Sequence, residues 1–289
     1  MLQESSVFVA KTQAHALPTH CRRYEGQVVI VTGAAQGLGR VIARRVAEEG
    51  AQVLVCDVQE ARLQRTAERL QQETGQRFVA MTGDLALPGV AQRMLELAVS
   101  EFGHVDTLVN NAAALIRMRL EDFSEELLQK AVNWNVWNTL RSCKAVVPHM
   151  LERKYGRIVN IGGEAWRTGT PFHTLLGGVG KGAMVGLTAT LAGETARHGI
   201  TVNCLSPGGV ESAADGDAEA AALSTPLDPS WNPPEVIAEL MKYAAGSPTS
   251  MGRLAHPTEI AAAVAFLGSP EASYITGQHL GASGGLVMI

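Results

Sequence analysis

Residues 32–39 read TGAAQGLG and lie between the apolar run Val28–Val31 and a helix-like stretch that begins at Arg40. Glycines make this turn tight and let a ligand approach bare backbone, while the free N–H groups at the start of a helix attract anions. The turn is therefore predicted to hold the pyrophosphate of a dinucleotide. The residues expected to contact it are Gly33, Gln36, Gly37, Leu38 and Gly39.

An acidic residue follows at the distance that a dinucleotide site needs. Asp57 ends the second apolar run, Val53–Cys56, where a carboxylate accepts hydrogen bonds from both hydroxyls of the adenosine ribose. Its charge repels the 2′-phosphate of NADP, and residues 34–36 contain no basic side chain to offset it. A glycine-rich turn without a ligand is the alternative, but the spacing favours a cofactor site that takes NAD.

Outward from this turn, short apolar runs alternate with helix-like segments such as 40–49, 61–73, 89–102 and 124–140. Most runs are apolar on both faces, which is typical of parallel strands covered by helices on both sides. The pattern predicts an α/β chain, a single-domain Rossmann fold with a doubly wound parallel sheet of about seven strands and helices on both faces. The expected strands are 28–31, 53–56, 78–82, 107–109, 158–161, 201–205 and one near 278–281.

Three segments describe the expected domain organisation. Residues 1–24 form an N-terminal arm, and 25–289 form the Rossmann domain without an interdomain linker. Within it, residues 211–251 interrupt the alternating pattern with several prolines. This segment follows the sixth strand at the edge of the sheet where α/β proteins bind ligands, and long irregular insertions there are often functional. We interpret it as a substrate lid, and a purely solvated loop is the alternative.

Composition argues against several other functions. The net charge is −4 and there is no long basic run, so neither nucleic acid nor a membrane is expected as a partner. No apolar run is long enough to span a bilayer, and the N-terminus lacks the pattern of a secretion signal. We expect a cytoplasmic protein with reduced thiols and no metal, because the spacing of the cysteines, at 21, 56, 143 and 204, fits no metal site.

TGAAQGLG resembles the TGxxxGxG signature of the short-chain dehydrogenase/reductase family, and the likeness covers roughly residues 25–289. It implies that Asp84 and Leu85 flank the adenine, and that Pro207, Gly208 and Val210 lie beside the nicotinamide carboxamide. It also implies that Asn110, Asn111, Ala112 and Ala113 line the cofactor. Further matches are Gly83–Leu85, Asn110–Ala113, Val132–Leu140, Gly156–Ile161, Pro207–Gly208, Thr276–Gly277 and Gly284–Gly285.

The resemblance also locates the catalytic positions. Lys181 matches the family's lysine, expected to contact the nicotinamide ribose, and Asn135 matches the asparagine of its water relay. The family's tyrosine stands four residues before the lysine, on the same helix face, and that position is Gly177. Its serine falls on Gly162 or Gly163, so both reactive hydroxyls are absent.

Two nearby side chains are candidates to carry a proton in their place. Glu164 follows the serine position, and His173 precedes Gly177 by four residues. A histidine titrates near neutrality, and burial raises the pKa of a carboxyl group. The alternatives are a loop carboxylate paired with Arg167 and an exposed loop histidine. The glycines from Gly177 to Gly182 indicate close packing, and the two absent side chains predict extra space beside the nicotinamide.

These residues predict an NAD-dependent oxidoreductase that acts on a small organic substrate through a non-standard active site. A non-redox lyase, isomerase or dehalogenase that keeps bound NAD is one alternative, and an inactive NAD-binding scaffold or regulator is the other. Retention of Lys181 and Asn135 favours an enzyme. The resemblance further implies a homodimer or homotetramer, assembled through helices at residues 124–147 and 181–198.

Overall fold

A computed structural model describes residues 21–211, 229–246 and 249–288 of the 289-residue chain. It contains a seven-stranded sheet in the order β3-β2-β1-β4-β5-β6-β7, in which every neighbouring pair is parallel. The predicted fold class is confirmed. The strands are β1 (Val28–Thr32), β2 (Gln52–Asp57), β3 (Phe78–Thr82), β4 (Thr107–Asn110), β5 (Gly156–Ile161), β6 (Ile200–Pro207) and β7 (His279–Ala282).

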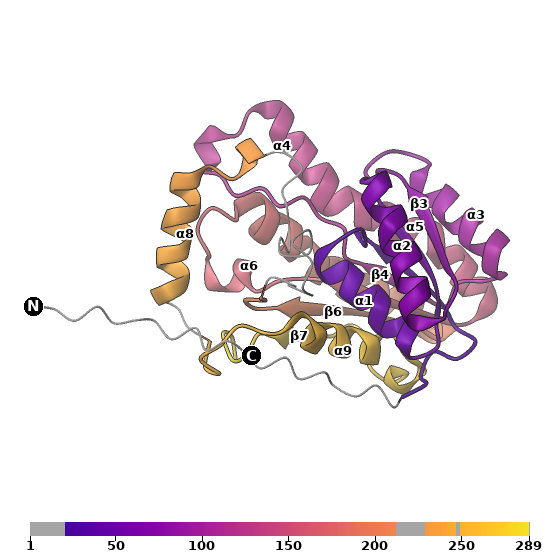
Figure 1. The fold of residues 1–289 in the computed structure, drawn as a ribbon. Helices are drawn as coiled ribbons and strands as arrows, with labels where there is room; N and C mark the ends of the chain where they lie inside the picture. Colours follow the sequence, from indigo (N-terminus) through magenta and orange to yellow (C-terminus); the bar gives the residue numbers. More distant parts are fainter. Residues whose placement is uncertain (1–20, 212–228, 247–248, 289) are drawn as a thin grey trace, which may run out of the picture.

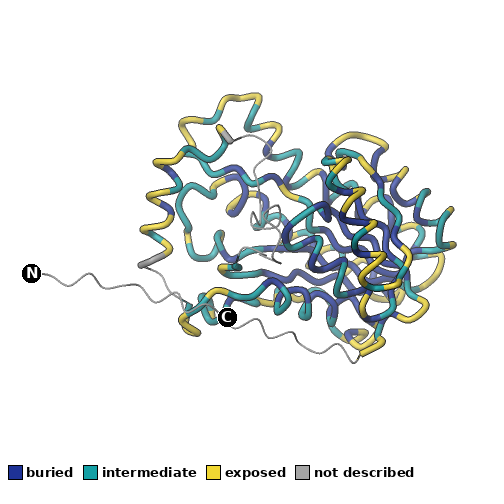
Figure 2. Tube along the Cα trace, viewed as in Figure 1, coloured by how far each residue is buried: buried dark blue, intermediate teal, exposed yellow. Residues whose placement is uncertain are grey.

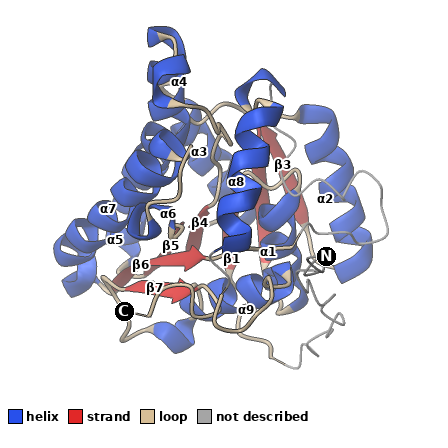
Figure 3. Ribbon diagram, turned by 90° about the vertical axis from the view of Figure 1, so that its left-hand side faces the viewer, coloured by secondary structure: helices blue, strands red, loops and turns tan. Residues whose placement is uncertain are grey.

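Helices cover the sheet on both faces (Figures 1 and 3). One face packs against α1 (Gly37–Glu48), α2 (Glu60–Thr74) and α9 (Pro257–Leu267). The other packs against α3 (Val90–Phe102), α5 (Asn138–Arg153) and α7 (Gly182–Thr195). Each layer has its own apolar core, and the central strands are buried along their length (Figure 2). This double coverage is why the strand residues are apolar on both sides.

The remaining helices gather at the carboxyl ends of the strands. They are α4 (Glu125–Val132), α6 (Ala165–Thr168), α8 (Pro234–Gly246) and two π-helical segments, η2 (Asn133–Trp137) and η3 (Thr174–Lys181). The strand order reverses between β1 and β4, which places the ligand crevice of such a sheet at their carboxyl ends. Of the predicted lid, residues 212–228 and 247–248 lie outside the described residues, and 234–246 form α8.

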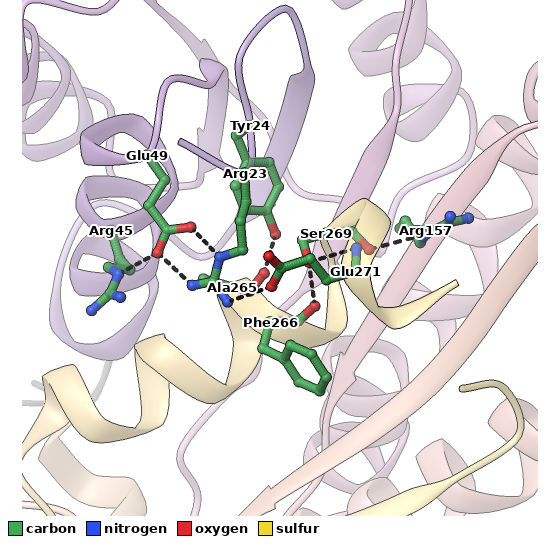
Figure 4. A network of polar contacts seen from close by, with 9 residues as sticks. All are labelled: Arg23, Tyr24, Arg45, Glu49, Arg157, Ala265, Phe266, Ser269 and Glu271. Atoms are coloured by element: carbon green, nitrogen blue, oxygen red, sulfur yellow. Dashed lines mark hydrogen bonds and ion pairs between the residues drawn. The ribbon is translucent and has the colours of Figure 1, made fainter. Parts of the chain in front are cut away.

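The N-terminal boundary of the domain differs from the prediction. Arg23 donates two hydrogen bonds of 2.6 Å to the buried Glu49, which also accepts one from Arg45 (Figure 4). Tyr24 is fully buried, and its hydroxyl donates to the carbonyl of Ala265 in α9 at 2.7 Å. The folded domain therefore includes Arg23 and Tyr24, earlier than the predicted residue 25. Residues 1–20 of the predicted arm lie outside the described part of the chain.

Candidate active site

The turn between β1 and α1 has the shape that an anion cradle requires. Gly33 and Gly37 have φ angles of +66° and +57°, which favour glycine. A Cβ atom at Gly39 would lie 2.2 Å from the carbonyl oxygen of Gly33, so a side chain there would break the turn. Gln36 caps α1, but its side chain accepts none of the first N–H groups of the helix. Those N–H groups remain available to a phosphate.

Polar contacts fix this turn to the loop after β4. The side-chain amide of Asn111 donates to the carbonyls of Thr32 and Gly33, each at 3.0 Å. The hydroxyl of Thr32 accepts from the backbone N–H groups of Asn111 and Ala112, also at 3.0 Å. Asn111 thus has a structural role at the edge of the crevice. The resemblance also placed Asn110 beside the cofactor, but that side chain is buried and donates to Asn160 at 2.9 Å.

A cavity of about 260 Å³ opens at the carboxyl ends of β1, β2 and β4. Ten of the predicted cofactor residues line it: Gly33, Gln36, Leu38, Gly39, Asp57, Asp84, Leu85, Asn111, Ala112 and Ala113. Gly37 does not line it, although its N–H lies at the start of α1. Lys181, Pro207, Gly208 and Val210 are absent from its wall too. Sequence reasoning missed Cys56, Val58, Gln59, Gly83, Ala114, Leu115, Trp134 and Asn138.

Asp57 lies at the rim of this cavity, where its carboxylate is fixed by the backbone. Its two oxygens accept hydrogen bonds from the N–H groups of Ala35 at 3.1 Å and Gln59 at 3.0 Å. Arg62 of α2 lies close by and donates to the side-chain carbonyls of Gln36 and Gln59. Sequence reasoning missed this arginine because it belongs to the following helix rather than to the turn.

Trp134 connects the cavity to the segment predicted as a lid. Its indole N–H donates to Asp84 at 3.2 Å, and Asp84 also accepts from the N–H of Ala86 at 2.8 Å. The Trp134 ring packs on Trp231, with the ring centroids 5.2 Å apart. Trp231 is the residue that ends the short helix before α8. Trp134 therefore contacts both Asp84 in the cavity wall and Trp231 of the predicted lid.

Lys181 and Asn135 lie on adjacent π-helical segments. The ammonium of Lys181 donates to the carbonyl of Ile161 at 2.8 Å, and desolvation lowers its pKa to about 8 despite an opposing effect of the Cys204 thiol. Asn135 is buried, accepts from the N–H of Ala114 at 3.1 Å and donates to Ala131 at 2.9 Å. A Cβ at Gly180 would lie 2.8 Å from the Cβ of Asn135, so this glycine lets the two segments approach.

The glycines at the expected serine positions differ in the space around them. A Cβ at Gly162 would lie 2.3 Å from the Ser206 hydroxyl and 2.7 Å from the Cys204 sulfur, which excludes a side chain. A Cβ at Gly163 would have Cγ of Lys181 as its nearest neighbour, at the van der Waals distance of 3.4 Å. Only Gly163 therefore has room for a serine, directly beside Lys181.

At Gly177 the extra space expected from the sequence is filled. A Cβ there would lie 2.5 Å from the methyl group of Ala165 and 3.0 Å from the Cβ of His173. The prediction of extra room is thus wrong at this position and holds only at Gly163. The close packing inferred from the glycine run is found at Gly177 and Gly180, but a Cβ at Gly178 or Gly182 would meet no described atom within 4 Å.

Glu164 is buried, with 3% of its surface exposed. Neither carboxylate oxygen has a hydrogen-bond partner, and the guanidinium of Arg167 lies 3.7 Å away, beyond hydrogen-bond length. The side chain packs against Gly281 of β7. An isolated buried carboxylate is costly in free energy, so this group needs a bound water or a ligand. The pairing with Arg167 expected as an alternative is present only as this long contact.

His173 is half-buried and has a defined tautomer, so the exposed-loop alternative is wrong. Its Nε2 lies 3.3 Å from Nε of Arg117, and Nδ1 lies 3.0 Å from the carbonyl of Pro171. Since an arginine only donates, Nε2 accepts from Arg117 and Nδ1–H donates to Pro171. Desolvation lowers the pKa of His173, the Pro171 contact opposes this, and Arg117 lowers it further. The imidazole is neutral at pH 7.

Pro207, Gly208 and Val210 lie where β6 ends. A Cβ at Gly208 would lie 2.8 Å from the carbonyl oxygen of Ser283, and Val210 forms an isolated bridge with Ala255. The backbone is therefore closely packed against the end of β7. Nearby, the Ser206 hydroxyl accepts from the N–H of Gly163 at 3.0 Å and pairs with His279 at 2.6 Å. Sequence reasoning singled out neither Ser206 nor His279.

Known proteins resemble the chain in sequence and in fold. Residues 27–222 match the short chain dehydrogenase family. The chain is 34% identical over 270 residues to 2,3-dihydroxy-2,3-dihydro-p-cumate dehydrogenase of Pseudomonas putida, covering 92% of this chain and 96% of that protein. It is also 34% identical over 265 residues to 1,6-dihydroxycyclohexa-2,4-diene-1-carboxylate dehydrogenase of Acinetobacter baylyi, covering 91% and 97%.

A solved structure shows the same relationship. The 3-oxoacyl-acyl-carrier-protein reductase of Brucella melitensis, crystallised with bound NAD, is 30% identical and superposes with a TM-score of 0.76. The match covers 93% of this chain and 94% of that protein. With the anion cradle, the fixed carboxylate of Asp57 and the matched lysine on one scaffold, the chain belongs to the short-chain dehydrogenase family and is one of its oxidoreductases.

Proposed function

We propose that the chain is an NAD-dependent oxidoreductase that acts on a small organic substrate without the serine and tyrosine hydroxyls of its family. The observation that carries this proposal is the contrast between the two halves of the crevice. The adenosine half has the glycine turn, the free N–H groups of α1 and Asp57. The catalytic half keeps Lys181 and Asn135, but has bare backbone at Gly163 and a filled space at Gly177.

NAD supplies the hydride chemistry when it is bound. Gly33, Gly39 and the start of α1 hold its pyrophosphate, and Asp57 accepts from its adenosine ribose. Lys181 lies half-buried with its stem beside Gly163, and we assign to its ammonium the other ribose. Pro207–Val210, where β6 ends, are the residues to which the family resemblance assigns the carboxamide.

His173 is the residue to which we assign proton transfer. It packs against Gly177, which is the position of the family's tyrosine, and Nε2 is the ring nitrogen without a proton, able to take one when Arg117 no longer donates to it. Glu164, the other candidate from the sequence, lies beyond Gly163 and packs against β7. Its oxygens, which have no hydrogen-bond partner, are suited to hold a water or a polar substrate group rather than to replace the tyrosine.

The test is a substrate-dependent change in the absorbance of the reduced nicotinamide. Dihydroxylated cyclohexadiene carboxylates with NAD⁺, and 3-oxoacyl thioesters with NADH, are the first substrates to try, because relatives are named for them. We expect His173→Ala to abolish turnover and leave NAD affinity nearly unchanged, while Glu164→Gln keeps measurable turnover. His198→Ala, at an exposed histidine, is the control.

Two results would contradict the proposal. If turnover survives His173→Ala and is lost in Glu164→Gln, the proton carrier is Glu164. If no substrate changes the nicotinamide absorbance although NAD binds, the non-redox or scaffold interpretation replaces the oxidoreductase.

A further inference from the structure

Within residues 21–211, 229–246 and 249–288, Arg117 has no carboxylate as a hydrogen-bond or ion-pair partner. Its Nε donates to His173 at 3.3 Å, and its Nη1 donates to the side-chain carbonyl of Asn232 at 3.2 Å. Both acceptors are neutral, and Nη2 has no hydrogen bond to any described residue. Desolvation by burial lowers its pKa. A partly desolvated guanidinium with neutral partners is costly unless an anion joins it.

Two neighbouring arginines, unlike Arg117, lie near a carboxylate. Arg119, two residues along the same loop, forms an ion pair with Glu239 of α8. Arg167, at the end of α6, lies 3.7 Å from Glu164. Among the described residues of this part of the molecule, Arg117 is the arginine that faces only neutral groups. Its charge is thus available for a ligand.

The position of Arg117 is next to the catalytic centre. His173 separates it from Gly177, since the Cβ of His173 lies 3.0 Å from where a Cβ of Gly177 would stand. On its other side, the backbone N–H of Arg117 donates to the carbonyl of Trp231 at 2.9 Å. The surrounding side chains form an apolar cluster that includes Ile116 and Leu175. Small-molecule sites typically combine apolar side chains with a few charged or polar groups, as this cluster and Arg117 do.

We propose that Arg117 binds a carboxylate group of the substrate, which makes the preferred substrate an organic acid. This inference rests on the proposed function. A carboxylate fits the Nε and Nη2 edge of a guanidinium through two parallel hydrogen bonds, and Nη2 is the nitrogen without a described partner. A phosphate group has nearly twice the charge, and a single arginine would leave much of it unbalanced.

Carboxylate binding also affects His173. The Nε–H of Arg117 occupies the lone pair of Nε2 in the free protein. A carboxylate that takes this donor leaves Nε2 free to accept a proton, while Nδ1–H stays fixed by the Pro171 carbonyl. One anionic group would therefore anchor the substrate and make its proton acceptor available.

The experiment compares benzoate with benzamide, which has the same shape without the charge. Each is titrated into the NAD-saturated full-length protein by calorimetry, with the fluorescence of Trp231 and Trp134 as a second readout. We expect benzoate to bind at least tenfold more tightly than benzamide. In Arg117→Gln the dissociation constants of benzoate and benzamide should differ by less than twofold. Arg119→Gln, which removes the same charge from the same loop, should keep the tenfold preference for benzoate.

Equal binding of benzoate and benzamide to the wild type, or an unchanged preference in Arg117→Gln, would overturn the proposal. Tighter binding of phenyl phosphate than of benzoate would overturn the choice of carboxylate. If thermal unfolding shows that Arg117→Gln is not folded, Arg117→Lys replaces it, and a lysine should weaken benzoate binding at least threefold because it lacks the paired geometry. These are binding measurements, so they stand even if the protein transfers no hydride.

Discussion

Single residues decide which dinucleotide fits the crevice. The carboxylate of Asp57 is held by two backbone N–H groups, and the guanidinium of Arg62 lies beside Gln36 and Gln59 on the same rim. In the wild type the carboxylate repels a 2′-phosphate, although an arginine that would pair with one is close by. We expect the balance between these two opposite charges to set the preference for NAD or NADP.

Asp57→Ala should therefore narrow the preference for NAD over NADP, because the repulsion is lost and Arg62 remains. Dissociation constants for both dinucleotides, measured by fluorescence titration, check this. The control is Glu60→Ala, which removes the same charge from an exposed position three residues along. A wild type that binds NADP more tightly than NAD would show that Asp57 does not read the ribose.

Lys181 gives a pH dependence of stability. Its pKa is about 8 in the folded chain and 10.5 when exposed, so the folded state holds this proton more weakly. The unfolded state binds more protons between these values, and stability from this group rises as the pH increases from about 8 to 10.5. The cost of burying the charge is present in full below pH 8.

Relative to Lys181→Arg, which stays charged throughout, the wild type should gain on the order of 3 kcal/mol in free energy of unfolding across that range. Denaturant titrations at pH 7 and pH 10 measure the difference. If the free energies of unfolding of the two proteins changed equally between pH 7 and pH 10, the Lys181 ammonium would be solvated in the folded state.

Among the elements, the glycine-rich π-helical segment η3 is the one whose surroundings differ most from those predicted from the sequence. Gly177 lies against Ala165 and His173. A Cβ added at its neighbour Gly178, in contrast, would meet no described atom within 4 Å. The two glycines therefore form a matched pair. Gly178→Ala should stabilise the chain by up to about 1 kcal/mol, because alanine favours a helical backbone. Gly177→Ala should destabilise it, because its methyl group would overlap that of Ala165.

Restoring the family's serine and tyrosine at Gly163 and Gly177 tests how these two glycines affect activity. Gly163→Ser should fold normally, since its nearest neighbour is the flexible stem of Lys181. Adding Gly177→Tyr should cost about 1–3 kcal/mol through overpacking and lower the native activity, because the ring displaces His173. Thermal unfolding and turnover are measured on both variants. A double variant with raised alcohol–ketone activity and a normal melting temperature would indicate a damaged ordinary dehydrogenase instead.

The sequence predicted the strands well because each is a short apolar run bounded by turns. It predicted one helix over 124–140, where the structure has α4, the π-helical η2 and the start of α5. A π-turn leaves little trace in side-chain periodicity, and here it depends on Asn135 bonding to Ala114 and Ala131. The partners of His173 and Arg117 could not be predicted either, because these hydrogen bonds join the loop after β4, the loop before η3 and the segment before α8, which are more than 50 residues apart in sequence.

At the scale of the whole molecule, the helix from Thr174 to His198 has an exposed apolar face. It is 25 residues long, and its most apolar stretch of 18 residues has a mean hydropathy of 1.3, which by length and composition would suffice to cross a membrane. Its buried side packs against β6, however, and its exposed side has the small residues Gly186, Ala189 and Gly193. A Cβ at either of these glycines would meet no described atom within 4 Å. Such a stripe lets a second helix approach closely.

We therefore expect this helix to pack against its copy in a homodimer or homotetramer, because association removes apolar surface from water. Light scattering during size-exclusion chromatography at micromolar concentration should give two or four subunits. Ala189→Glu should shift the protein to monomer, because it places like charges across the twofold, while Gln64→Glu on the exposed side of α2 should not. A monomeric wild type would contradict the prediction. If that monomer also floated with liposomes, the apolar face would be a membrane surface rather than a subunit contact.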